Sequence, residues 1–240
     1  MSSRRVCFGA VLGAVLMAAV PAQAADLYIR TALTFAGPLE ALRAGYEAAT
    51  GDKLHTVAAD APADVVVLQQ AQFAPLLKDS KVDASALTDM ARVRVGFAVK
   101  AGAPVPDIST PDKLKAVLLA ARSVGLSSGP SGVYVTEEVF PKMGIAGEMK
   151  AKTVAASGPV GESVAKGTVE VGFQQMCELL PVKGITVVGR IPEALQRVTV
   201  ITAGIPKDAK SPEVARRSIA YVTSPAAAAA LKTMDLEPVK

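Results

Sequence analysis

Residues Ala63 to Gln70, with the sequence ADVVVLQQ, constrain the fold more than any other stretch of the chain. The unbroken run of valine and leucine leaves no polar face, which is typical of a strand buried on both sides in a parallel sheet. Parallel neighbours need a crossover, usually a helix, and apolar residues at helical spacing occur over 36–51 and again over 71–78. The sequence therefore predicts an α/β fold with mixed, mostly parallel sheets.

Strand and helix patterns alternate through the rest of the chain, with helices expected to start near Pro111, Pro212 and Pro225. Two loops divide the chain. Proline-containing loops at 101–111 and 189–193 bracket a middle block that has its own strand–helix units. The long strands expected over 93–100 and 196–205 lie beside these loops and would carry the chain across. We therefore expect two lobes joined by two hinge crossings. The expected first lobe comprises residues 26–97 plus 199–240, and residues 98–198 form the inserted second lobe.

The first 24 residues have the three-part pattern of a secretory signal peptide. Arg4 and Arg5 precede an apolar stretch that ends near Val20, and a small-residue cleavage signal closes at Ala24. The apolar stretch is shorter than the roughly 20 residues that span a bilayer. We expect cleavage after Ala24 and release of a soluble protein into the periplasm, without membrane insertion. Export through either the Sec or the Tat route is compatible with this segment.

Charge and cysteine content exclude two further classes of protein. The formal net charge is +4, and removal of the two charges of Arg4 and Arg5 leaves +2, so no strongly basic surface for nucleic acid is expected. Of the two cysteines, Cys7 lies in the signal peptide, and Cys177 alone cannot form an intramolecular disulfide. We expect Cys177 to be a small buried residue on a helix.

Four polar or glycine-bearing segments follow predicted strands, where ligands collect in an open α/β sheet. They are Arg30–Thr34, Ser127–Gly132, Ser157–Gly161 and the pair Gln174–Gln175. Hydroxyls, carboxamides and the unpaired amides of helix N-termini would bind an anion or another oxygen-rich ligand there. Serine and glycine before a helix also form ordinary caps and turns, so one segment alone would indicate little. Four at corresponding strand ends predict a binding cleft.

The sequence contains no complete set of residues for the common hydrolase or metal-site motifs. Ser163 and Lys166 have the Ser-x-x-Lys spacing of serine acyl-enzymes, but the companion motifs are missing. His55 is the only histidine, which leaves a Ser-His-Asp relay or a histidine metal site without its other members. We therefore expect a protein that is not an enzyme and that holds no cofactor or metal. A serine hydrolase built on Ser163 and Lys166 is the alternative.

Several segments, taken together, resemble a known family. APADVVVL, PSGVYVTEEVFPKMGI, VEVGFQQ and YVTSPAAAAALK are similar, in order and spacing, to segments of the molybdate-binding-like receptors of ABC transporters. The resemblance implies a type II periplasmic-binding-protein fold that closes about its hinge on a small anion. It also implies a monomer that delivers the anion to an inner-membrane ABC permease. A sensor role, with docking on a membrane regulator, is compatible with the same residues.

The chain departs from this family where the family binds its oxyanion. Ala32 stands where the resemblance places a serine, and Gln175 where it places a tyrosine. A second serine-rich loop, expected before Ala61, is missing. Each lost hydroxyl removes a hydrogen bond worth roughly 1.5–3 kcal/mol to a charged group. These departures favour a small organic di- or tricarboxylate, resembling aconitate, over molybdate or tungstate, which stay as the alternative ligands.

The expected ligand-binding residues come from both lobes. Arg30 and Arg92 are the cationic candidates, because guanidinium groups bind planar carboxylates in a bidentate manner. The others supply hydroxyl, amide or backbone donors at strand ends: Thr31, Ala32, Ser128, Ser131, Gly132, Val160, Gln174 and Gln175.

Overall fold

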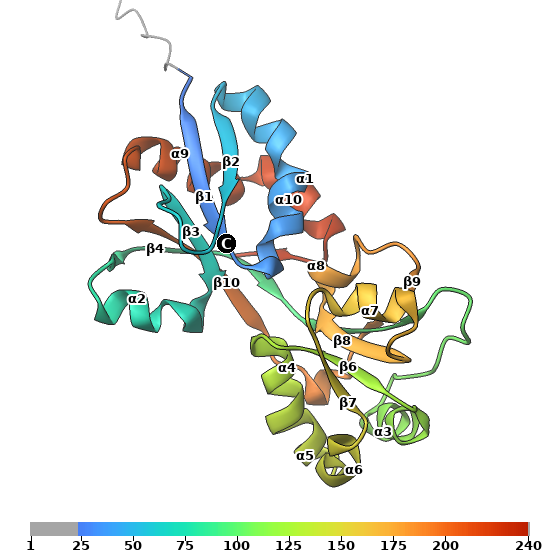
Figure 1. Ribbon diagram of the computed structural model, residues 1–240. Helices are drawn as coiled ribbons and strands as arrows, with labels where there is room; N and C mark the ends of the chain where they lie inside the picture. Colours follow the sequence, from blue (N-terminus) through green and yellow to red (C-terminus); the bar gives the residue numbers. More distant parts are fainter. Residues whose placement is uncertain (1–23, 240) are drawn as a thin grey trace, which may run out of the picture.

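The computed structural model describes residues 24–239 and shows an α/β protein with two lobes, each built on its own sheet (Figure 1). The strand order is β11-β4-β10-β3-β1-β2 in the first sheet and β7-β6-β8-β5-β9 in the second. The predicted signal peptide lies outside the described residues, apart from Ala24. The residue boundaries proposed for the two lobes stay a prediction.

The first sheet combines parallel strands with antiparallel ones. Its β1 is parallel to β2 and β3, whereas β10 is antiparallel to β3 and β4, and β11 is antiparallel to β4. The strands are β1 (Asp26–Thr31), β2 (Lys53–Val57), β3 (Val65–Gln69), β4 (Val82–Val93), β10 (Thr199–Pro206) and β11 (Glu237–Pro238). The associated helices are α1 (Leu33–Thr50), η1 (Gln70–Phe73), α2 (Ala74–Lys78), α9 (Pro212–Val222) and α10 (Pro225–Thr233).

The second sheet has the same mixed character. Its β6 is parallel to β7 and β8, and β5 is antiparallel to β8 and β9. The strands are β5 (Val95–Lys100), β6 (Val124–Ser127), β7 (Thr153–Ala156), β8 (Val171–Gln175) and β9 (Ile185–Arg190). The helices are α3 (Pro111–Ala120), α4 (Pro130–Tyr134), η2 (Val135–Val139), α5 (Phe140–Lys142), α6 (Ala146–Lys150), α7 (Val160–Lys166), α8 (Met176–Leu179) and η3 (Glu193–Leu195).

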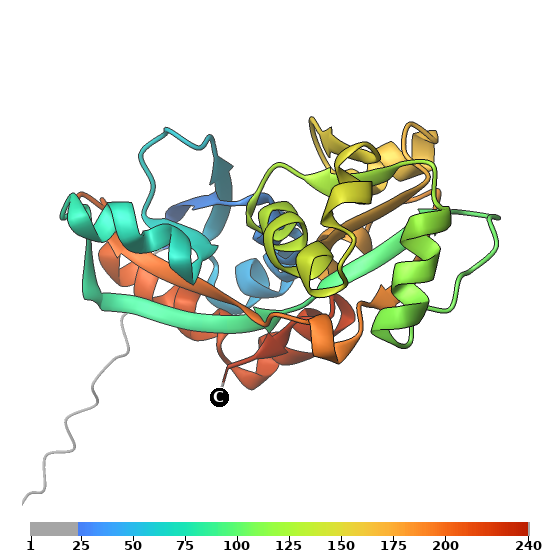
Figure 2. The same cartoon turned by 90° about the horizontal axis from the view of Figure 1, so that it is seen from below.

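The strands that connect the lobes account for the antiparallel pairs. Figure 2 shows β4 and β5 running on from one lobe into the other along one side of the molecule, with β10 beside β4. The predicted mixed α/β fold is confirmed, but antiparallel pairing is more extensive than expected. A strand that enters a sheet from the other lobe is antiparallel to the strands beside it. The residues from Val82 to Ala91 of β4 had not been predicted as a strand.

Helix starts follow the local signals in the sequence. The predicted starts at Pro111, Pro212 and Pro225 are confirmed, and the hydroxyl of Thr110 accepts a hydrogen bond from the amide of Lys113 at 3.3 Å. Helix α1 begins at Leu33, before the predicted start near 36. The earlier turn places Phe35 on the same buried face as Leu39, where both rest against the sheet.

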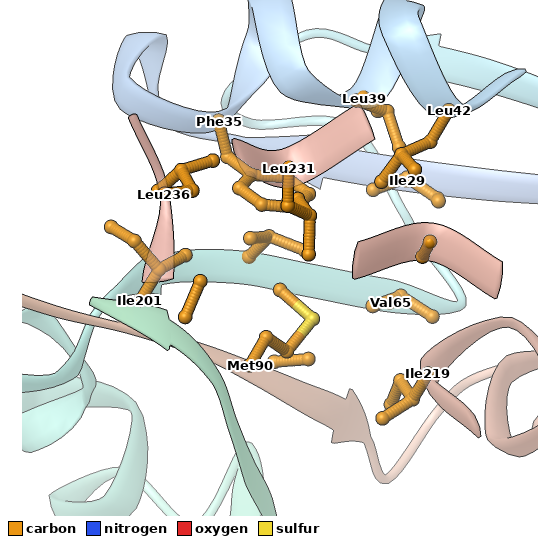
Figure 3. Packing of buried hydrophobic residues seen from close by; sticks show 14 of the residues in the cluster. Ile29, Phe35, Leu39, Leu42, Val65, Met90, Ile201, Ile219, Leu231 and Leu236 are labelled. Atoms are coloured by element: carbon orange, nitrogen blue, oxygen red, sulfur yellow. The ribbon is translucent and has the colours of Figure 1, made fainter. Parts of the chain in front are cut away.

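The core of the first lobe packs one face of its sheet against α1, α9 and α10. Figure 3 shows Phe35 and Leu39 of α1 and Leu231 of α10 beside Ile29 and other strand residues. These side chains are at most 3% exposed, and each contributes about 1.5–3 kcal/mol of burial free energy. This packing anchors α1, whose N-terminus lies where the two lobes meet. No helix within residues 24–239 has the length and apolar character to cross a membrane.

Candidate functional site

The strand ends of each lobe bring the predicted polar segments together. In the second sheet, Ser127 is paired with Ala156, and Leu126 with Phe173, so the loops after β6, β7 and β8 leave the same edge. In the first sheet, Thr31 is paired with Val67. The structure therefore places Thr31 and Ala32 in one group and the segments around Ser127, Val160 and Gln174 in another.

The elbow at Ser127–Gly132 is a tight turn whose polar groups largely satisfy one another. The Ser127 hydroxyl accepts a hydrogen bond from the Gly129 amide at 2.9 Å, and the Gly132 amide donates to the Gly129 carbonyl at 3.0 Å. A Cβ atom at Gly132 would lie 1.7 Å from the Ser127 carbonyl oxygen, so packing requires glycine there. Ser131 is buried and Ser128 is exposed.

The second elbow has its backbone donors occupied by a side chain of the same lobe. Oε1 of Gln174 accepts hydrogen bonds from the amides of Val160 at 2.8 Å and of Gly161 at 3.4 Å. Gln174 is fully buried, and its Nε2 has no hydrogen-bond partner within residues 24–239. An anion could reach these amides only by displacing the carboxamide.

Gln175 connects the second sheet to the returning strand β10. Its Nε2 donates to the Thr199 hydroxyl at 3.2 Å, and its buried Oε1 has no partner in the described part of the chain. In the first lobe, the Thr31 hydroxyl donates to the Ala32 carbonyl at 3.0 Å. Several of the predicted groups are thus engaged by neighbours in the same chain, and their role in binding a ligand stays a prediction.

The two predicted arginines lie apart from the elbows. Nη1 of Arg30 donates to the Ala59 carbonyl at 3.2 Å, and the residue lines a separate cavity of about 380 Å³ together with Asp60, Lys81 and Lys207. Arg92 lies within β4, between its ladder partners on β10 and β11. In the described part of the chain, neither arginine hydrogen-bonds to an elbow residue.

A cavity of about 370 Å³ lies between α1 and the α7–α8 region, where the two lobes meet. This volume falls in the usual range for sites that bind small molecules. Leu33 and Pro159 in its lining are neighbours of the predicted Ala32 and Val160. The lining residues are Leu33, Ala36, Gly37, Pro159, Glu162, Cys177, Glu178, Pro181, Val182 and Lys183. We call this space the interlobe cavity.

The interlobe cavity contains an acid that sequence reasoning missed. Burial raises the pKa of Glu178, although the side chains of Thr34 and Gln174 and the backbone of Gln175 act in the opposite direction. Glu178 forms no ion pair within residues 24–239. One signal in the sequence could have identified Glu178. It lies three residues after Gln175, the last residue of a strand whose end had been predicted to face the ligand.

Cys177, the neighbour of Glu178, is buried as predicted. It is 1% exposed, its Sγ donates to the Thr34 carbonyl at 3.0 Å, and burial raises the pKa of the thiol. A thiol in such surroundings is protonated and a poor nucleophile. We therefore assign Cys177 a packing role across the lobe junction.

The structure does not support the alternative of a serine hydrolase, because Lys166 is not placed to act as the base for Ser163. Lys166 pairs with Glu162 at 3.2 Å, one turn away on α7, and no hydrogen bond joins it to the Ser163 hydroxyl in the described structure. A serine nucleophile needs a base within hydrogen-bond reach. Residues 24–239 also bring together no group of three or more histidine, cysteine, aspartate or glutamate side chains that could hold a metal ion.

A model of the family described as bacterial extracellular solute-binding protein matches residues 27–234. The chain belongs to this family. The solute-binding protein is also 34% identical to an aconitate isomerase from Pseudomonas sp, over 95% of each chain. These findings confirm the resemblance drawn from the ordered segments.

Solved structures confirm the two-lobed fold. The periplasmic molybdate-binding protein of Azotobacter vinelandii matches with a TM-score of 0.73 and 18% identity, over 89% of this chain and 100% of that one. Peb3 from Campylobacter jejuni matches with a TM-score of 0.68 and 15% identity, over 88% and 99%. At these identities the likeness establishes the fold of the solute-binding protein and leaves its ligand open.

The expectation that the chain is not an enzyme is wrong, because the relative at 34% identity carries the name of an enzyme. The expectation rested on the missing partners of Ser163, Lys166 and His55 in the sequence. An isomerase that moves a proton needs only one well-placed acid or base. A single acid or base forms no recognisable motif in a sequence.

Proposed function

We propose that this solute-binding protein takes a planar tricarboxylate between its two lobes and isomerises it, as the name of its relative, aconitate isomerase, describes. The observation that carries this proposal is the 34% identity over 95% of both chains, because so extensive a match includes both lobes and the junction between them. The interlobe cavity, which holds an acid without a cationic partner, is compatible with such chemistry.

The second elbow reduces the support for molybdate or tungstate as the ligand. Because Gln174 occupies the amides of Val160 and Gly161, the start of α7 offers few free donors to molybdate or tungstate. The ligand residues predicted from the sequence remain part of this proposal. Thr31, Ala32 and Ser131 would approach the ligand from the strand ends, and Arg30 and Arg92 would do so only after a rearrangement.

A receptor role in import is a second candidate function, favoured by the match to the extracellular solute-binding family. In this role a periplasmic monomer, exported with its signal peptide removed, would close about its hinge and deliver the anion to an inner-membrane ABC permease. Hinge closure around a ligand is a common movement of two-lobed binding proteins. Both functions would use the same cavity between the lobes.

The purified chain from Ala25 to Lys240 tests the proposal. The protein is incubated with cis-aconitate and, separately, with trans-aconitate, and the products are followed by proton NMR. We expect conversion in both directions and an increase in melting temperature with either isomer, because a ligand at a hundredfold excess over its Kd stabilises by about 2.7 kcal/mol.

A panel of molybdate, tungstate, sulfate and citrate serves as the control. A melting temperature that rises only with molybdate or tungstate, with no conversion of either aconitate, would contradict the proposed function. A rise with aconitate but no conversion would favour the receptor role alone.

A further inference from the structure

Glu178 occupies an unusual position in this molecule. It lies on α8, directly after β8, and lines the interlobe cavity opposite α1 of the first lobe. The wall from α1 consists of Leu33, Ala36 and Gly37, none of which is charged. Glu178 therefore lines a space that can hold a small molecule, at the junction of the two lobes.

The surroundings of Glu178 hold the carboxyl group without neutralising it. Oε1 of Gln174 is directed to the amides of Val160 and Gly161, and its Nε2 has no hydrogen-bond partner among the described residues. Gln174 and Thr34 are nevertheless close enough to counter the effect of burial on the Glu178 carboxyl. Neutral neighbours of this kind can orient a carboxylate and still leave its charge free to accept a proton.

Other titratable groups near Glu178 lie at the edge of the cavity or are inert. Glu162 and Lys183 line the same cavity and are exposed, and Glu162 is paired with Lys166. On its own helix, Cys177 has a raised pKa, caused by burial and, to a smaller extent, by the charges of Glu178 and Asp235. Lys183 forms no ion pair within residues 24–239, so it is available to a substrate carboxylate at the mouth.

We propose that the Glu178 carboxyl group transfers the proton in the isomerisation of a tricarboxylate bound in the interlobe cavity, an inference that rests on the function proposed above. Aconitate has a methylene group next to its carbon–carbon double bond. The carboxylate removes a proton from the methylene carbon, so a C–H bond breaks and an O–H bond forms. The electron pair of the broken C–H bond forms a new double bond to the neighbouring carbon. The electrons of the original double bond move to its other carbon, the far carbon.

The same carboxyl group then returns the proton. Its O–H bond breaks, a C–H bond forms at the far carbon, and the double bond has moved by one position. No atom is gained or lost, and no oxidant, reductant or co-reactant is needed. A partly buried carboxylate suits the first step, because weaker solvation makes it a stronger base than an exposed one.

Glu178→Gln tests the assignment, since it keeps the shape of the side chain and removes its basicity. We expect kcat for aconitate to fall about 10²- to 10⁴-fold, the usual contribution of a general acid–base group, with KM changed by less than threefold. The matched control is Glu213→Gln, which changes a first-turn acid on α9 that is exposed and paired with Arg216. The control should retain full activity.

The pH profile of the wild-type protein adds a readout that a merely structural role would not produce. We expect kcat to rise with pH through one ionisation above the ordinary glutamate value of about 4.3, and Glu178→Asp to keep that step at a lower rate. A flat profile between pH 4 and 8 would overturn the assignment even if Glu178→Gln failed to fold.

The outcomes separate the two proposals. If the wild-type protein converts aconitate and Glu178→Gln stays within threefold of its kcat, the isomerase function stands and the role of Glu178 is refuted. If the wild-type protein converts neither isomer, the proposed isomerase function fails, and the role of Glu178 fails with it.

Discussion

Asp52 is a buried acid and Glu178 is a partly buried one, and their surroundings differ. Asp52 accepts hydrogen bonds from Nε of Arg217 at 2.9 Å, from the Tyr46 hydroxyl at 2.8 Å and from the Ala25 amide at 3.2 Å. Burial alone would raise the pKa of Asp52, but these bonds outweigh it and hold the pKa below its usual value. Glu178 forms no ion pair within residues 24–239, and burial raises its pKa.

The difference follows from where each acid lies. Asp52 precedes β2 and joins the start of β1, helix α1 and helix α9 within the first lobe, so neutralisation by Arg217 stabilises the lobe. Glu178 lies between the lobes beside a cavity. Buried acids with a full set of partners are structural, whereas those without a counter-charge beside a cavity are candidates for chemistry.

The largest expected effect is that of Asp52→Asn. The substitution removes a fully buried charge that accepts hydrogen bonds from Arg217 and Tyr46, and we expect the free energy of unfolding to fall by about 3 kcal/mol at pH 7. Urea denaturation of the wild type and the variant measures this loss of unfolding free energy. Asp26→Asn is the control, since Asp26 is exposed and, among the described residues, pairs only with His55, and it should change stability by less than about 0.5 kcal/mol.

The pH dependence of this effect has a definite sign. The pKa of Asp52 is lower in the folded state than in the unfolded chain, so its stabilisation is present above about pH 4 and is lost as the pH falls through the folded value. The difference between wild type and Asp52→Asn should therefore shrink in acid. A difference that grows below pH 4 would contradict our description of this site.

Tyr46→Phe should have a smaller effect on the same site. The ring is 2% exposed and stays packed, but Asp52 loses one of its donors while it keeps Arg217. We expect a loss of about 1.5 kcal/mol, the lower value for a hydrogen bond to a charged group. Tyr28→Phe, at an exposed ring, is the control in the same denaturation series. Equal losses in both variants would show that the hydroxyl of Tyr46 contributes nothing specific.

Glu178→Gln should change stability in the opposite direction. Removing a partly buried acid that lacks a counter-charge is expected to raise the free energy of unfolding by about 0.5–2 kcal/mol at pH 7. Because the pKa of Glu178 is higher in the folded state, the wild type loses stability as the pH rises from about 4.3 through the folded value. The gain should therefore disappear below about pH 4.

The comparison with Asp52 fails if Glu178→Gln destabilises the protein. A loss of more than about 1 kcal/mol at pH 7 would mean that the Glu178 carboxylate has a strong partner, as Asp52 has. Thermal unfolding at pH 4 and pH 7 shows whether Glu178→Gln stabilises or destabilises the protein. Asp52→Asn, measured under the same conditions, is the reference for a destabilising substitution.

The smallest expected effect is that of Glu162→Gln on stability. Glu162 lines the same cavity as Glu178, but it is exposed and pairs with Lys166 one helical turn away. Exposed pairs at this spacing contribute about 0.3–0.5 kcal/mol. We expect a loss within that range in urea denaturation, reduced further at high salt. A loss above 1 kcal/mol would show that exposure is a poor guide to the roles of these acids.

Local patterns predicted much of the fold. The valine run of β3, the proline-marked starts of α3, α9 and α10, and the buried Cys177 follow from residue size, backbone restriction and hydrophobic periodicity. The segment from Val82 to Ala91 escaped prediction. It is a strand only because β10 returns from the other lobe to pair with it.

The candidate site was predicted less completely. The polar segments were placed correctly at strand ends, but the sequence could not show which of their groups bind one another. It takes the fold to bring Oε1 of Gln174 to the amide of Val160, 14 residues earlier. Glu178 was missed for a related reason. Its environment depends on α1, which lies far away in the sequence and packs against α8 only in the folded molecule.

The amino-acid sequence by itself determined the strand–helix alternation, the two-lobed family and the strand ends at which polar groups gather, because these depend on interactions between residues close along the chain. Tertiary structure alone decided which acids are neutralised. Asp52 meets Arg217 across 165 residues, and Thr34 meets Cys177, beside Glu178, across 143. Solvation and pairing of a buried charge are properties of the assembled fold, and they separate a structural acid from one available for chemistry.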